Sequence, residues 1–81
     1  MSSSIDNLVE RLSTAARHVL HARNIIARQE AVIERLRRVG AHTATPERLL
    51  ELFKTTLQLF ENDYKRLKQE FDAKTKDPWS A

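Results

Sequence analysis

Apolar residues recur every three or four positions in two long runs, one from residue 5 to 39 and one from residue 46 to about 73. This spacing is the heptad repeat of coiled-coil helices, in which the positions called a and d form one apolar face. The first run places at a and d the residues Ile5, Leu8, Leu12, Ala15, Val19, Ala22, Ile26, Gln29, Ile33 and Leu36. The second run places there Leu50, Phe53, Leu57, Phe60, Tyr64, Leu67 and Phe71. The pattern predicts two long amphipathic helices.

The segment between the two runs carries residues that end one helix and begin another. Gly40 is well suited to the left-handed conformation that follows a helix C-terminus. Thr45 before Pro46 is a favourable N-cap, and Thr43 is an alternative one. Asp77 before a proline disfavours continuation of the second helix. We therefore predict a single domain over residues 1–81, with a helix at about 5–39, a turn at 40–45, a second helix at about 46–73 and a flexible tail at 74–81.

An antiparallel hairpin needs a register, and the two heptad patterns match when facing residues are symmetric about the turn. Small residues then meet large rings, as in Ala22 opposite Tyr64. The same register aligns three oppositely charged pairs, namely Arg37 with Glu47, Glu30 with Lys54, and Arg23 with Glu61. Leu8, Val9 and Leu12 extend past the second helix in this register. Trp79 of the tail covers them, stays available to a partner protein, or is disordered. We predict an all-α, coiled-coil-like two-helix hairpin.

A second group of apolar residues lies beside this seam, in the half of the hairpin nearest the turn. Its members come from both helices, at positions g and c, and are Ile25, Val32, Val39, Leu49, Leu52, Thr56 and Leu59. Apolar residues that converge on one side favour a contact surface, whereas scattered surface leucines are the plainer interpretation. Two helices of this size also have little interior of their own. We therefore expect a homodimer that forms a four-helix bundle.

Composition and charge restrict the classes of function. Cysteine is absent, so disulfides and thiolate metal sites are excluded. Residues 1–6 lack the basic and apolar regions typical of a secretory leader, and no run of about 18 apolar residues occurs. We therefore expect a cytoplasmic protein without a membrane partner. Charged residues make up 31% of the chain with a net charge of +3, which is too small by itself to indicate a polyanionic partner.

Few residues suggest chemistry. His18 and His21 could face one metal ion, but no third ligand accompanies them, so we favour a solvated or ion-paired couple, with His18 near Glu70. Gln29 is the one polar seam residue; it either forms a hydrogen bond within the bundle, which we favour, or lines a polar pocket near Tyr64. We find no catalytic constellation, small-molecule substrate site or cofactor motif, and we expect no enzyme.

Five basic residues follow the outer face of the first helix, and they are Arg17, His21, Arg28, Arg35 and Arg38. A basic stripe can follow nucleic-acid phosphates, although a solvated helix face carries charge as well. No aromatic residues interleave with the stripe, so stacking on bases is not indicated. Our leading hypothesis is a non-enzymatic protein-interaction or regulatory module, and an RNA- or DNA-binding hairpin dimer is the alternative.

The central part of the chain, about residues 20–68, resembles a group of short uncharacterised proteobacterial proteins. The residues that carry the resemblance are Ile26-Ala27-Arg28-Gln29, Ile33-Glu34-Arg35-Leu36, Gly40, Thr43, Leu49-Leu50 and Thr56-Leu57. The chain departs from that pattern at Ala41, where a histidine commonly follows the glycine. The resemblance implies a bacterial cytoplasmic helical hairpin, and because that group has no assigned activity, it transfers no functional residue.

Overall fold

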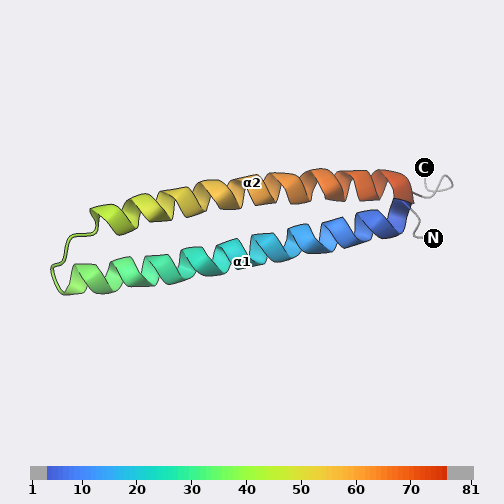
Figure 1. Ribbon diagram of the computed structural model, residues 1–81. Coiled ribbons are helices and arrows are strands. Elements are labelled where there is room, and N and C mark those ends of the chain that lie inside the picture. The colour runs from blue at the N-terminus through green and yellow to red at the C-terminus, as the bar shows by residue number, and fades with distance from the viewer. Residues whose placement is uncertain (1–3, 77–81) are drawn as a thin grey trace.

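The computed structural model describes residues 4–76 and consists of two antiparallel helices (Figure 1). Helix α1 spans Ser4–Arg38 and helix α2 spans Ala44–Thr75. The N-terminal end of α1 lies beside the C-terminal end of α2 (Figure 1). The predicted all-α hairpin is confirmed, with helix ends that differ from the expected bounds by one or two residues. The three alternatives for Trp79 concern a residue outside the described range.

The interior of the described hairpin is the seam between the helices. The molecule measures 62 × 30 × 15 Å, so its thickness is close to that of one helix with its side chains. The buried residues within positions 4–76 all occupy predicted a and d positions, and they are Leu8, Ala15, Val19, Ala22, Ile26, Ile33 and Leu67. Helix α2 supplies only one of them, because its aromatic seam residues are half-buried. The heptad pattern therefore predicted the seam, and one side of α2 remains incompletely covered.

Gly40 ends α1 as the sequence predicted. Its φ angle is +72°, and its N–H donates to the carbonyl of Arg37 at 3.1 Å. The next N–H, from Ala41, donates to the carbonyl of Leu36 at 2.9 Å. These two hydrogen bonds form a Schellman motif, which satisfies carbonyls that the end of the helix leaves without partners.

We expect Gly40→Ala to lower the free energy of unfolding by about 1–2 kcal/mol, since a Cβ disfavours positive φ. A Cβ at this position meets nothing within 4 Å, so the cost arises from the backbone alone. Urea unfolding followed by circular dichroism measures the change. Gly40→Asn is the matched control, because asparagine tolerates the left-handed region and should lose less. Equal losses in the two variants would contradict this explanation.

Helix α2 begins earlier than expected. Thr43 is its N-cap, and the Thr43 carbonyl accepts a hydrogen bond from the Glu47 N–H at 2.9 Å, although the Thr43 side chain makes no capping bond. The preferred N-cap, Thr45, is therefore wrong, and the alternative is right. Pro46 fits inside this first turn because the first N–H groups of a helix have no intrahelical acceptor.

The register differs from the expected one by about one heptad. Leu67 was expected opposite Val19, but it forms a buried cluster with Leu8 and Ala15, against which Leu12, Tyr64 and Phe71 pack. Leu8 and Leu12 therefore do not extend past α2. A shift of about seven residues keeps each a position facing a d position, so the heptad pattern does not distinguish the two registers. The observed register covers the N-terminal leucines, which the expected one leaves to water.

Two of the three expected ion pairs form in spite of this shift. Arg23 lies 3.0 Å from Glu61, and Arg37 pairs with Glu47. Long arginine and glutamate side chains reach diagonally along the seam, so these pairs are compatible with both registers. Lys54 lies 3.8 Å from Glu51 on its own helix, and the expected pair with Glu30 is absent within residues 4–76. All of these groups are exposed, so each pair contributes little to stability.

Candidate protein-interaction surface

The apolar residues beside the turn stay largely uncovered in the hairpin. We call this surface the apolar flank, and its residues are the seven predicted ones: Ile25, Val32, Val39, Leu49, Leu52, Thr56 and Leu59. Val39 is 78% exposed, Leu52 64% and Leu59 63%. Leu49 and Thr56 are exposed as well, whereas Ile25 and Val32 are half-buried. The flank is therefore an aliphatic surface on both helices that the single chain leaves in contact with water.

The floor of the flank is apolar too. Ile25 and Thr56 line a small hollow together with Phe53 and Phe60, both of which are half-buried. The Thr56 hydroxyl donates to the carbonyl of Leu52 at 3.0 Å, so its hydrogen-bonding need is met within α2. Thr56 can therefore join an apolar contact without leaving a buried donor unpaired.

Two arginines border the flank on α1. Arg28 and Arg35 occupy the column next to Ile25 and Val32, and neither forms an ion pair within residues 4–76. The other arginines of this half of α1 are neutralised, since Arg23 and Arg37 pair with glutamates of α2 and Arg38 lies 3.4 Å from Glu34. The free positive charge of the turn-proximal half of α1 is thus concentrated beside the apolar flank.

The acidic residues of this half lie on the opposite side of the hairpin. Glu30, Glu34, Glu47 and Glu51 line one open cleft there, together with Arg37 and Arg48. They are the only carboxylates between residues 21 and 60. Sequence inspection alone did not identify this separation, although the heptad positions of the four glutamates, b and e, contain the signal for it. The two sides of the turn-proximal half therefore differ in both polarity and charge.

The predicted basic stripe is only partly available. Arg17 donates to the Thr14 hydroxyl at 3.2 Å, and Arg38 is paired with Glu34, as noted above. His21 lines the hollow beside Phe60. Of the five residues, His21, Arg28 and Arg35 are exposed and have no hydrogen-bond or ion-pair partner among the described residues, and Arg28 and Arg35 are the two arginines of this group.

His18 contacts an aromatic ring and lines a cleft. His18 packs against Phe60 with 5.1 Å between ring centroids. It lines an open cleft with Asp63 and Arg11, so its expected proximity to Glu70 is wrong for the same one-heptad reason. Within residues 4–76, no three side chains of His, Cys, Asp or Glu gather in a way that could hold a metal ion.

Gln29 forms the favoured kind of hydrogen bond. Its amide nitrogen donates to the carbonyl of Pro46 at 2.9 Å, which ties the C-terminal half of α1 to the first turn of α2. Tyr64 packs instead against the cluster of Leu8, Ala15 and Leu67. The structure therefore does not form the alternative polar pocket from Gln29 and Tyr64.

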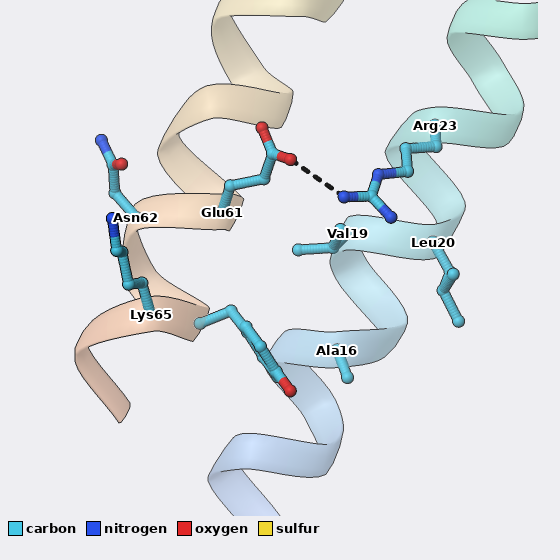
Figure 2. A pocket seen from close by; sticks show the side chains of 8 residues that line it. Ala16, Val19, Leu20, Arg23, Glu61, Asn62 and Lys65 are labelled. Carbon is cyan, nitrogen blue, oxygen red and sulfur yellow. Dashed lines mark hydrogen bonds and ion pairs between the residues drawn. The ribbon is translucent and has the colours of Figure 1, made fainter. Parts of the chain in front are cut away.

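A third open cleft lies on the side of the hairpin opposite the apolar flank, nearer the termini. Figure 2 shows Val19 pointing across toward α2, Leu20 pointing away from it, and the ion pair of Arg23 with Glu61 at one end. Leu20 is 63% exposed. This cleft has one large exposed aliphatic residue, whereas the apolar flank has several on two helices. The flank is therefore the stronger candidate for a contact surface.

Three further ion pairs of the described residues are local to α2. Arg66 lies 2.5 Å from Asp63, and Lys74 lies 3.8 Å from Glu70. Lys68 donates to Asp72 at 2.7 Å, and this hydrogen bond raises the pKa of the Lys68 ammonium. These pairs connect neighbouring turns of one helix, and they create no convergent group of the kind that binds a ligand.

The description of the apolar flank rests on the side chains of this chain and not on similarity to another protein. The described helices contain no apolar stretch of the length needed to cross a bilayer. The resemblance to the proteobacterial hairpins stays a prediction, and it assigns no residue to the flank. Comparison of the chain with family models, with curated proteins and with solved structures finds no match.

Proposed function

We propose that this protein is a non-enzymatic protein-interaction module of a regulatory kind. The hairpin associates with a second copy through the apolar flank, forms a four-helix bundle and presents its outer faces to another protein. The observation that carries the proposal is the exposure of Val39, Leu52 and Leu59 on one side of the hairpin. Isolated surface leucines need no explanation, but aliphatic residues that converge from two helices are typical of a contact surface.

A second hairpin would also cover seam residues that one chain leaves half-buried. Phe53 and Phe60 stay half-buried in one chain, and the 15 Å thickness of the molecule leaves them a single layer of cover. Burial of a largely exposed leucine stabilises a contact by roughly 1–2 kcal/mol. The exposed aliphatic residues of the flank enter an isologous contact twice, once from each copy. Cooperative stacking of two hairpins is thus the simplest way to remove this surface from water.

Sedimentation equilibrium of the full chain tests the proposal. At tens of micromolar we expect twice the 9.4 kDa mass of one chain, and a melting temperature that rises with protein concentration. The mass of a single chain throughout this range would refute self-association through the flank.

A second candidate is nucleic-acid binding, and it is favoured by the unpaired state of Arg28 and Arg35. This function needs the arginines but not the aliphatic residues. It predicts that a fluorescent RNA duplex binds the protein with an affinity that falls steeply with salt. The variant Arg28→Glu/Arg35→Glu should abolish that binding. Binding that is absent, or independent of salt, would eliminate this candidate.

A further inference from the structure

We infer that the apolar flank accepts an amphipathic helix of another protein whose apolar face is bordered by acidic residues, and that this helix displaces the second copy. The inference rests on the proposed use of the flank as a contact surface. It adds the chemical class of the partner, which follows from the distribution of charge around the flank.

The edge of the flank on α1 carries two positive charges that no carboxylate of the described residues neutralises. Arg28 and Arg35 lie next to the aliphatic column of Ile25 and Val32, and neither has an ion-pair partner within the described residues. They are separated by two helical turns, or roughly 10 Å. Carboxylates two turns apart on a partner helix would lie at the same spacing. Each such pair at the edge of a dry contact adds affinity and fixes the orientation of the partner.

A second copy of this chain has no unpaired carboxylate to offer at the flank. Asp63, which lies just past the flank on the same side, already pairs with Arg66 at 2.5 Å. An isologous contact places the same surface on both sides. Every carboxylate between residues 21 and 60 lines the cleft on the opposite side of the hairpin. The homodimer therefore leaves the arginines of both copies unpaired at its edge, whereas an acid-bordered helix pairs them. The two occupants cover the same aliphatic residues and exclude each other.

This charge distribution gives the two contacts opposite responses to salt. Salt screens attraction between a partner's carboxylates and the arginines, so it weakens the heterotypic contact. The affinity of self-association rises or stays constant with salt, because the arginines at its edge carry like charges and salt screens their repulsion. The sign of the salt effect therefore separates the two contacts.

The test uses the full chain and two synthetic helical peptides of about 20 residues, which span roughly 30 Å. Both peptides carry the same leucine face; glutamates border it in one and lysines in the other. We expect the acidic peptide to bind on the order of tenfold more tightly by fluorescence anisotropy at low salt. We also expect it to reduce the sedimentation mass of the protein dimer to that of a one-to-one complex.

Charge reversal provides the decisive variant. Arg28→Glu/Arg35→Glu should prefer the lysine-bordered peptide. Its matched control, Arg17→Glu/Lys65→Glu, makes the same charge change at exposed positions away from the flank and should keep the preference of the unmodified chain. Both variants alter solvent-exposed side chains, and circular dichroism verifies that their helicity is unchanged.

Four results would overturn the inference. One is equal binding of the two peptides, and another is a preference that charge reversal does not alter. A third is tighter binding to phosphatidylcholine–phosphatidylserine vesicles than to the acidic peptide, which would assign the flank to a membrane surface. If neither peptide binds a chain that dimerises, the inference fails and the proposed self-association stands. If a monomeric chain binds the acidic peptide with the expected preference, self-association and the displacement of a second copy fail, and the assignment of an acid-bordered partner stands.

Discussion

Leu8→Ala is expected to lower the free energy of unfolding by about 2–4 kcal/mol, because it leaves a cavity in a close-packed cluster. Leu8 is only 2% exposed and packs with Ala15 and Leu67. In the register expected from the sequence, Leu8 has no opposing helix, and the same change would cost well under 1 kcal/mol. Urea unfolding of the full chain measures the loss. A loss of a few tenths of a kcal/mol would contradict the observed register.

A double-mutant cycle separates this packing effect from a general loss of helix stability. Leu8→Ala and Leu67→Ala should couple by about 0.5–3 kcal/mol, since their side chains share one cluster. Leu36→Ala provides the matched control, because Leu36 lies at the far end of the seam and should be additive with Leu67→Ala. Coupling confined to the first pair places Leu67 beside Leu8. Coupling of equal size in both pairs would indicate instead that the whole hairpin frays together.

The sequence predicted the helices and the turn because each depends on local chemistry. The seam follows from the spacing of residues such as Val19 and Ile26, and Gly40 follows from the positive φ that a helix end requires. The register was not predictable in the same way. A heptad repeat is unchanged by a shift of seven residues, and flexible ion pairs such as Arg23 with Glu61 tolerate that shift. The two registers differ at the end of the seam, where α2 covers Leu8 in the observed register and does not reach it in the expected one.

The sequence likewise predicted one part of the candidate surface, the residues of the flank, and not the other, the pairing state of the arginines. The seven residues of the flank could be proposed from their heptad positions, because those positions fix the side of the helix on which a residue lies. The state of the arginines could not, because it depends on which carboxylates a side chain reaches in space. Arg38 pairs with Glu34 on its own helix, and Arg37 pairs with Glu47 across the seam. Arg28 is left without an ion-pair partner among the described residues, and the proposal of an acidic partner rests on this feature.

We expect Leu52→Lys/Leu59→Lys to raise the dissociation constant of the homodimer at least about a hundredfold, since two ammonium groups must then enter an apolar contact. Lysine is preferred to glutamate because a carboxylate here would pair with Arg28 or Arg35 of the second copy. Both leucines are nearly two-thirds exposed in the single chain, so the hairpin itself should fold normally. The measurements are sedimentation equilibrium and the concentration dependence of the melting temperature, which should disappear.

The matched control for this variant is Val9→Lys/Leu20→Lys. Leu20 is 63% exposed, as Leu59 is, and Val9 is 45% exposed, but both lie away from the apolar flank. The control adds the same charge to the hairpin, although on α1 instead of α2, so it corrects for general repulsion between copies. We expect the control to remain dimeric while the flank variant becomes monomeric. Dissociation of both variants would attribute the effect to net charge, and dissociation of the control alone would move the interface to the side that carries Leu20.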